Sequence, residues 1–160
     1  EVFGMFRTRL EDCGVEALMR IDPAMPAFLG SRLEMRQVLL HLVENAIDAM
    51  PDGGKLTVEG RVRAVDGGSE ETLSGDGTDG STGKVVEIRV CDTGEVIPEA
   101  VRGDIFQPFF TTREVGKGKG LGLAVCRSLV ETRQGRIELE KSLPGNTCFR
   151  ILLPFEKVPA

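Results

Sequence analysis

A glycine-rich stretch carrying two lysines is the first part of this sequence whose residue types indicate chemistry. Glycine occupies every second position of residues 116–122, and Lys117 and Lys119 lie between the glycines. This alternation suits neither a strand nor a helix interior, because glycine loses the most backbone entropy on folding. Residues Leu123–Val130 then have the apolar spacing of an amphipathic helix. Backbone N–H groups and the positive dipole end at such a helix start favour phosphate. The stretch predicts a phosphate site, with a surface linker as the alternative.

A second set of candidate residues lies on one long helix. Apolar residues follow a helical period from Leu33 to Met50, and Ser31 with Glu34 forms a capping box at its start. The polar residues expected on one side of this helix are His41, Glu44, Asn45 and Asp48. Amide and carboxylate oxygens suit Mg²⁺, which takes substrate phosphates as further ligands. A solvated polar face is the alternative, and His41 has the further alternative of a packed or capping histidine.

A third candidate is a carboxylate at the end of a strand. Asp92 directly follows the strand expected over Val85–Cys91, and Gly94 comes two residues later. A carboxylate at that position accepts hydrogen bonds, for example from the exocyclic amine of a nucleobase, although a simple turn has the same sequence. The aromatic run at 106–110 is expected to pack in the core and beside the glycine-rich stretch that follows it.

Composition restricts the class of protein. The chain has 160 residues, 41% hydrophobic and 28% charged, which fits one soluble globular domain. A net charge of −5 with no Trp or Tyr excludes a nucleic-acid binder. No apolar run has the length of a membrane span, and a first residue of Glu1 indicates a chain cut from something longer. The four cysteines form no C-x-x-C pair, so we expect reduced thiols in a cytosolic protein.

The order of the expected elements predicts an α+β fold: a two-layer α/β sandwich with a mixed, mostly antiparallel sheet and helices on one face. We treat residues 1–160 as one domain, in which 1–14 is a remnant of a preceding linker or helix. The segment 65–83 has six glycines, five acidic residues and no Lys or Arg, so we expect a disordered hairpin loop. The expected helices are Val2–Leu10, Leu33–Met50, Glu99–Ile105 and Leu123–Val130, and the expected strands are Glu16–Asp22, Ala27–Leu29, Lys55–Ala64, Val85–Cys91, Arg136–Lys141 and Thr147–Leu153.

The ordered set of motifs resembles the catalytic domains of sensor histidine kinases. HLVENAIDAM from His41, DTG from Asp92, FQPFFTTR from Phe106 and GKGLG from Gly118 resemble the N, G1, F and G2 boxes of that family. GNTCF from Gly145 resembles its last box, and the resemblance covers Ala17 to Pro154. It implies the Bergerat ATP-binding fold of the GHKL superfamily, with ATP and Mg²⁺ as cofactors.

The resemblance assigns roles by position. Asn45 matches the Mg²⁺-binding asparagine, Asp92 the aspartate that recognises the adenine amine, and Thr147 the threonine near it. It implies His41, Asn45 and Lys117 as catalytic residues. The residues implied to hold the nucleotide are Asn45, Asp48, Asp92, Gly94, Phe106, Thr111, Thr112, Lys117, Gly118, Lys119, Gly120, Leu121, Gly122 and Thr147, with 111–119 as the ATP lid.

Two positions depart from the family pattern. Val96 replaces the second glycine of the G1 box, and a β-branched residue suits positive φ poorly. We therefore expect a turn that is differently shaped or strained, with weakened nucleotide affinity as a consequence. His41 lies where the related ATPases have a water-activating glutamate four residues before the asparagine, which favours phosphoryl transfer over hydrolysis.

The chain has one histidine, His41, and it belongs to the N box, so the phosphoacceptor must lie elsewhere. The resemblance implies a histidine-bearing dimerisation domain N-terminal to Glu1 and a response-regulator receiver domain as partners. It also implies a cytoplasmic location within a homodimeric full-length protein, with membrane anchoring left open. The alternatives are a degenerate nucleotide-binding regulatory module and a GHKL-type ATPase or anti-sigma serine kinase.

Overall fold

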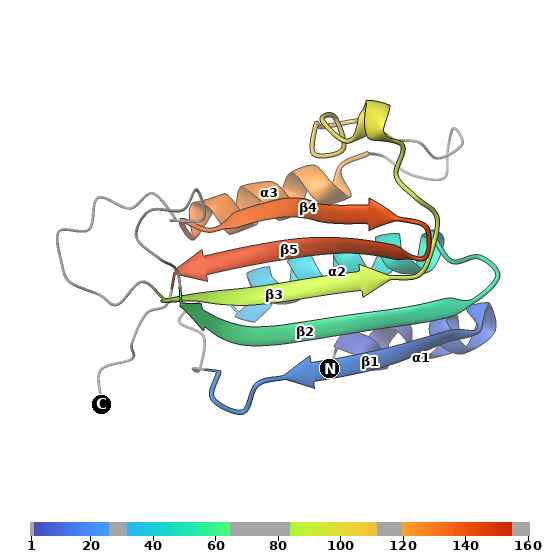
Figure 1. Ribbon diagram of the computed structural model, residues 1–160, viewed down its shortest axis with the longest axis horizontal. Helices are drawn as coiled ribbons and strands as arrows, with labels where there is room; N and C mark the ends of the chain where they lie inside the picture. Colours follow the sequence, from blue (N-terminus) through green and yellow to red (C-terminus); the bar gives the residue numbers. More distant parts are fainter. Residues whose placement is uncertain (1, 26–31, 65–83, 112–119, 155–160) are drawn as a thin grey trace, which may run out of the picture.

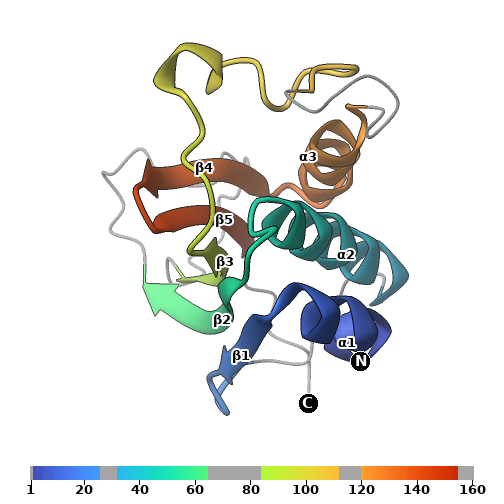
Figure 2. The ribbon, with the colours of Figure 1, turned by 90° about the vertical axis from the view of Figure 1, so that its right-hand side faces the viewer.

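The computed structural model describes residues 2–25, 32–64, 84–111 and 120–154. These residues form two layers, a five-stranded sheet and three α-helices that all pack on one face of it (Figures 1 and 2). This arrangement confirms the predicted α+β sandwich. Within the described ranges, no helix has the length and apolarity needed to cross a bilayer. The strand expected at 27–29, the cap at Ser31, the loop 65–83 and lid residues 112–119 lie outside these ranges.

The sheet is mixed and mostly antiparallel, as predicted. In spatial order its strands are β1 (Val15–Ile21), β2 (Gly54–Ala64), β3 (Lys84–Asp92), β5 (Asn146–Pro154) and β4 (Arg136–Leu143). Only the pair β1–β2 of these strands is parallel, and the long helix between them in sequence is its crossover connection. The expected strand ends differ from the observed ones by no more than a few residues.

The helices are α1 (Val2–Cys13), α2 (Arg32–Asp48) and α3 (Gly122–Thr132). The helix expected over Glu99–Ile105 is wrong, because that segment forms only the 3-10 turn η1 (Glu99–Val101) followed by turns. Its side chains explain the difference. Only Ile105 is buried there, and the guanidinium of Arg102 is bound to backbone oxygens outside the segment, so no apolar helical face exists.

The core lies between α2 and the sheet. Five residues on one side of α2 are almost completely buried: Val38, Leu42, Val43, Ala46 and Ile47. Alternate residues of the two central strands face them: Val86, Ile88 and Val90 of β3, and Phe149, Ile151 and Leu153 of β5. Because this set is apolar and continuous, it fixes which face of each central strand meets the helices.

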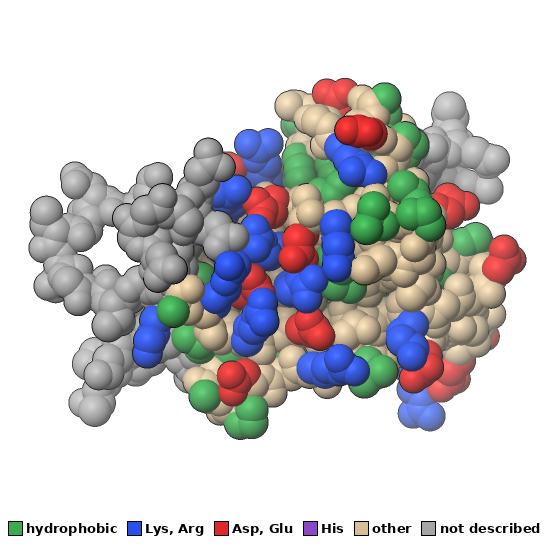
Figure 3. All heavy atoms as spheres, viewed as in Figure 1, with side chains coloured by type: hydrophobic (Ala, Val, Ile, Leu, Met, Phe, Trp, Pro, Cys, Tyr) green, Lys and Arg blue, Asp and Glu red, His purple; other side chains and the backbone are tan. Residues whose placement is uncertain are grey.

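The outer face of the sheet carries a network of charged side chains. Lysines and arginines gather over the central strands with glutamates between them (Figure 3). Glu87 is 1% exposed and forms ion pairs with Arg61, Arg63 and Arg150 from the two neighbouring strands. A buried carboxylate of this kind is tolerated only when it is paired. Cross-strand ion pairs therefore order the outer face of the sheet.

Two of the four cysteines form a disulfide, so the expectation of reduced thiols is wrong for this pair. Cys91 of β3 and Cys148 of β5 are direct partners in the antiparallel register, and a bond joins their sulfurs. They are 57 residues apart in sequence, and only strand pairing brings them together. Cys13 and Cys126 are free thiols, as predicted, and Cys126 is buried.

Candidate functional site

The predicted site residues converge at one end of the sheet. The end of β3 with Asp92, the start of β5 with Thr147, the last turns of α2 and the first turn of α3 meet there, at the right-hand end of Figure 1. The segment 93–111 leaves β3 at this end and runs over it toward α3. Elements that are far apart in sequence thus form one site.

Asp92 is a buried carboxylate at this end of the sheet. Only 6% of the residue is exposed, and its Oδ1 accepts a hydrogen bond from the Gly94 backbone N–H at 2.9 Å. Burial raises the pKa of Asp92 to about 6, and the bond from Gly94 offsets part of that rise. Because Asp92 lies on the same face as the core residues of β3, its carboxylate can accept a donor from the space between sheet and helices.

A hydrogen-bond chain next to Asp92 fixes the surrounding strands. Thr147 is the register partner of Asp92, and its Oγ1 lies 2.8 Å from Ser142 Oγ. Ser142 Oγ also accepts from the Ile97 backbone N–H at 2.8 Å, and Arg102 donates to the Ser142 carbonyl oxygen at 2.8 Å. Sequence reasoning missed Ser142 and Arg102, because no motif surrounds either and only the β4–β5 register brings Ser142 to Thr147.

Gly94 is required by a close approach between the turn and α2. A Cβ added at Gly94 would overlap the carbonyl oxygen of Ala49 and lie 2.8 Å from its carbonyl carbon. The Ala49 oxygen accepts the Glu95 backbone N–H at 3.1 Å, which holds the turn against the end of α2. Val96 is 39% exposed, and it is not among the described non-glycine residues with positive φ. The expectation of strain at Val96 is therefore wrong, and a turn shaped differently from that of the family stays a prediction.

The predicted polar side of α2 is divided between two neighbours. The His41 ring packs against the first residue of α3, since a Cβ built on Gly122 would lie 3.3 Å from its Nδ1. Glu44 and Asp48 instead form ion pairs with Arg9 of α1, at 3.2 Å for Glu44. Asn45 is half-buried one turn after His41. The structure therefore brings His41 to the start of α3 and ties Asp48 toward α1, and the predicted contact of Asp48 with nucleotide stays a prediction.

The two ends of the predicted lid meet at the start of α3. The Phe109 N–H donates to the Gly120 carbonyl oxygen at 2.9 Å, and both residues have left-handed backbones, with φ of 66° and 67°. A Cβ on Gly120 would lie 2.5 Å from the Phe109 carbonyl carbon, so glycine is needed there. Leu121 caps α3 without a side-chain hydrogen bond. Thr111 lies at the edge of the described segment, whereas Thr112, Lys117, Gly118 and Lys119 lie outside it.

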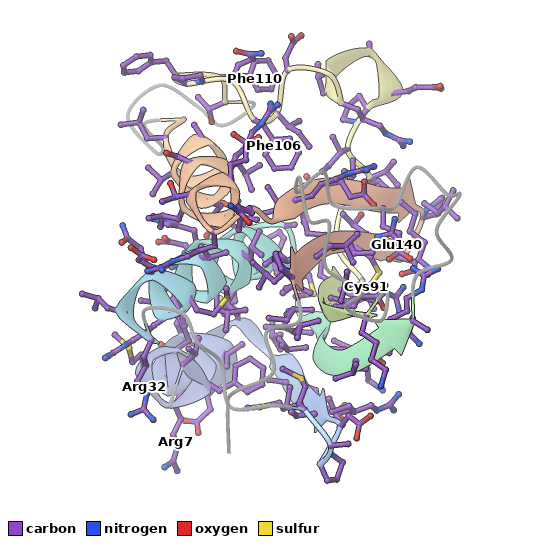
Figure 4. All side chains as sticks on the ribbon, turned by 90° about the vertical axis from the view of Figure 1, so that its left-hand side faces the viewer. Arg7, Arg32, Cys91, Phe106, Phe110 and Glu140 are labelled. Carbon is purple, nitrogen blue, oxygen red and sulfur yellow. A yellow bond between two sulfur atoms is a disulfide. The ribbon has the colours of Figure 1, made fainter. Side chains whose placement is uncertain are left out.

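Phe106 and Phe110 of the aromatic run before the predicted lid pack against the core, as predicted. Phe106 meets Phe149 of β5 edge to face, with ring centroids 6.2 Å apart and an interplanar angle of 88°. Figure 4 shows Phe106 and Phe110 on the segment that faces α3. Phe109 differs, because 77% of it is exposed. Phe106 thus anchors the segment that leads into the lid, and its predicted contact with nucleotide stays a prediction.

The arrangement combines a buried acceptor, a half-buried amide and a helix N-terminus without a side-chain cap. Residues 30–157 match the family model of histidine kinase-, DNA gyrase B- and HSP90-like ATPases. The chain belongs to this family. Within the family it is similar to the ATP-binding catalytic domains of two-component sensor histidine kinases, as the sequence motifs predicted. The family match also supports ATP as the ligand of the site.

Relatives among known proteins are sensor kinases. The chain is 39% identical over 121 residues to sensor kinase CckA of Brucella abortus, covering 76% of this chain and 12% of the relative. It is 34% identical over 139 residues to sensory histidine kinase/phosphatase NtrB of Rhodobacter capsulatus, covering 83% of this chain and 35% of the relative. The chain therefore corresponds to a small part of these longer proteins.

Solved structures support the same assignment. The nucleotide-free catalytic domain of histidine kinase ThkA has a TM-score of 0.72 and 25% identity, with 96% of this chain and 86% of that chain covered. Full-length ShkA in complex with AMPPNP has a TM-score of 0.76 and 25% identity, with 99% and 29% covered. A complex of ThkA with response regulator protein TrrA has a TM-score of 0.68 and 26% identity, with 96% and 38% covered.

Proposed function

We propose that this chain binds ATP together with Mg²⁺ and transfers the γ-phosphoryl group to a histidine on a separate dimerisation domain. The observation that carries the proposal is the buried Asp92 carboxylate, held beside Thr147 at the end of the sheet between α2 and α3. A carboxylate in this position is suited to the exocyclic amine of adenine. The family match and the AMPPNP complex of ShkA support the same ligand.

Asp92, Gly94 and Thr147 would hold the base. The Gly94 N–H already occupies Asp92 Oδ1, so the adenine amine would donate to the remaining acceptor capacity of the carboxylate. Gly94 has no side chain to separate the base from the turn, and the Thr147 hydroxyl lies on the register partner of Asp92. The hydrogen-bond chain through Ser142 keeps Thr147 in place.

The phosphates would lie toward the start of α3. The N–H groups of Gly120, Leu121 and Gly122 are at or next to its N-terminus, where an anion is stabilised by the helix dipole. Gly118, Lys117 and Lys119 precede it in sequence, and Thr111 and Thr112 enter the same lid. Lysine charge at this point would stabilise the transferred group.

Asn45 is the residue proposed to bind Mg²⁺. Among the residues that the structure describes, no group of three or more His, Cys, Asp or Glu side chains forms a metal cluster. A site with few protein ligands fits Mg²⁺, because this ion keeps several waters and binds substrate phosphates. The amide of Asn45 supplies an oxygen, which is the ligand atom that Mg²⁺ prefers. When bound, the ion neutralises phosphate charge during transfer.

The proposed partners follow from the single histidine. His41 packs against Gly122 inside the domain, so the acceptor histidine must come from another domain of the full-length protein. A response-regulator receiver domain is the proposed next acceptor, and the ThkA–TrrA complex supports this partner. A cytoplasmic location, homodimerisation of the full-length protein and membrane anchoring remain predictions. His41 itself is proposed to orient the start of α3.

The structure weakens the alternatives. The regulatory-module alternative depended on Val96, and Val96 is exposed and not in a left-handed conformation. The ATPase alternative requires a glutamate where this chain has His41, and Glu44 is paired with Arg9 of α1 instead. Transfer to a partner histidine therefore fits these residues better than hydrolysis does.

The test is phosphotransfer in trans. The chain is incubated with Mg²⁺ and γ-labelled ATP, with and without a purified dimerisation domain that carries a phosphoacceptor histidine. We expect acid-labile phosphate on that domain and its loss in Asn45→Ala, whereas Gln37→Ala, an exposed position on the same helix, retains transfer. Phosphate release without transfer would support the ATPase alternative, and nucleotide binding without either would support the regulatory module.

A further inference from the structure

The Cys91–Cys148 disulfide lies directly behind the proposed adenine site. Asp92 pairs with Thr147 in the β3–β5 register, and Cys91 pairs with Cys148 one position along. Successive residues of a strand point to opposite faces of a sheet, so the sulfurs lie on the outer face and the two base-binding residues on the helix face. Figure 4 shows Cys91 on the side of the sheet away from the helices, near Glu140.

The two sulfurs have different surroundings. Cys148 is 1% exposed, whereas Cys91 is only half-buried and is the sulfur that a solvent thiol can reach. The Arg89 guanidinium Nη2 lies 3.9 Å from Cys148 Sγ, and Glu59 and Glu140 hold that guanidinium in place. This guanidinium can stabilise a Cys148 thiolate, with its two carboxylate partners offsetting part of the effect, so Cys148 is the proposed leaving group.

We propose that Cys91–Cys148 is a reversible thiol–disulfide exchange site whose redox state sets the affinity of the domain for nucleotide. The reductant is a low-molecular-weight dithiol, and the oxidant for the reverse step is a small-molecule disulfide. Disulfides in reducing compartments are usually transient and redox-sensing, and the cytoplasmic location proposed above is such a compartment. The coupling to nucleotide rests on the proposed function.

The exchange takes two steps. One thiolate of the dithiol attacks Cys91 Sγ, the protein S–S bond breaks, and Cys148 leaves as a thiolate beside Arg89. The second thiol of the dithiol, after losing its proton, attacks the mixed disulfide, so that Cys91 leaves as a thiolate and a cyclic disulfide is released. Two electrons pass from the dithiol to the protein, and the two protons of the dithiol end on the cysteines or in solvent.

The bond affects the nucleotide through the strands it joins. The disulfide links β3 and β5 covalently at the residue pair next to Asp92 and Thr147. Cys148 Sγ also lies 3.3 Å from Oδ1 of Asn146, the residue that precedes Thr147. Without the bond the ends of β3 and β5 have more conformational freedom. Nucleotide binding must then also offset the entropy lost when these strand ends become ordered. We therefore infer that the reduced domain binds nucleotide more weakly than the oxidised domain.

The test measures thiols and nucleotide affinity on the same samples. Alkylation in denaturant followed by mass measurement should find two thiols before reduction and four after it, because Cys13 and the buried Cys126 are free. Calorimetric titration with Mg²⁺ and AMPPNP should show affinity about fivefold weaker after reduction, at the lower end of usual coupling between two sites. Cys91→Ser should have the weaker affinity in both conditions, and Cys13→Ser should keep the response.

A second readout follows from reciprocity. Saturating AMPPNP should make the disulfide harder to reduce by the same factor, measured as the dithiol concentration at half-reduction. Four thiols after treatment with a small-molecule disulfide, or equal affinity in proven oxidised and reduced samples, would overturn the proposal. Absence of nucleotide binding in both states would instead contradict the proposed function, while alkylation would still decide whether the exchange site exists.

Discussion

The two ends of the proposed nucleotide site are built in different ways. At the base end, Asp92, Thr147 and Ser142 belong to strands, are 6%, 3% and 1% exposed, and have hydrogen-bond partners within the domain. At the phosphate end, Phe109 and Gly120 have left-handed backbones, and Phe109 is 77% exposed. One end is part of the folded core, and the other is a junction between a turn and a helix.

This difference indicates how the two ends contribute to binding. A buried, hydrogen-bonded base site is preorganised, so in the proposed function it would bind adenine without further ordering. The junction at Phe109 and Gly120 bounds the predicted ATP lid, and closure of such a lid usually accompanies ligand binding. Changes at the base end should therefore affect every adenine ligand, whereas changes at the junction should affect mainly those with phosphates.

The largest expected effect is that of Asp92→Asn. It replaces a charged acceptor by an amide, and we expect a loss of about 2 kcal/mol, roughly thirtyfold in affinity for AMPPNP, from losing a hydrogen bond to a charged group. Adenosine should lose affinity by a similar factor. Calorimetric titration measures both, and Asp104→Asn on an exposed turn is the control. Binding within twofold of the parent chain would contradict the role of Asp92.

The pH dependence of binding is the second test of the base end. With a pKa of about 6, Asp92 is mostly neutral at pH 5, so affinity should fall about tenfold between pH 7.5 and pH 5 if the carboxylate form binds.

The contribution of Asp92 to folding stability depends on pH in the opposite direction. Because the folded pKa is raised above the unfolded value of 3.8, Asp92 contributes stability that is fully present below that value and is lost as pH rises through about 6. Asp92→Asn should remove both dependences, and a persistent pH effect on affinity in that variant would assign it elsewhere.

Gly120→Ala tests the phosphate end. The substitution places a Cβ 2.5 Å from the Phe109 carbonyl carbon in a left-handed backbone, which should cost about 1–2 kcal/mol of unfolding free energy. Affinity for AMPPNP should fall about fivefold, within the range of coupling between linked sites, and that for adenosine should stay unchanged. Thermal unfolding and titration measure the two effects. Gly103→Ala has open space around the added Cβ and is the matched control. Equal losses for both ligands would mean that the two ends are not separable.

The smallest effect is expected for Val96→Gly. Since Val96 is 39% exposed and not in a left-handed backbone, removing its side chain relieves no strain. AMPPNP affinity should change less than about twofold, as surface substitutions usually do. A clear gain in affinity would show that the departure from the family pattern weakens this site.

The sequence predicted those parts of the molecule that depend on local patterns. The apolar period of α2, the carboxylate at the end of β3 and the glycine at the start of α3 all occur where expected. Their signals are short-range, because helical period, turn residues and strand ends depend on neighbouring residues.

Features that depend on pairing between strands or helices could not be predicted in this way. The Cys91–Cys148 bond and the Ser142–Thr147 contact exist only through strand register. The polar side of α2 was expected as one surface, but Arg9 of α1 divides it. The helix expected over Glu99–Ile105 does not form for a similar reason, because the Arg102 side chain donates to the Ser142 carbonyl oxygen of β4.

The most direct measurement of the central claim is base selectivity of the unmodified chain. Guanine has a carbonyl oxygen where adenine has its amine, so a guanine nucleotide would place an acceptor against the Asp92 carboxylate. In titrations with Mg²⁺ and the imido-triphosphate of each nucleoside, we predict binding of the adenine form at one site per chain. The guanine form should bind at least about a hundredfold more weakly. Equal affinity for the two, or no binding of the adenine form at millimolar concentration, would contradict the account.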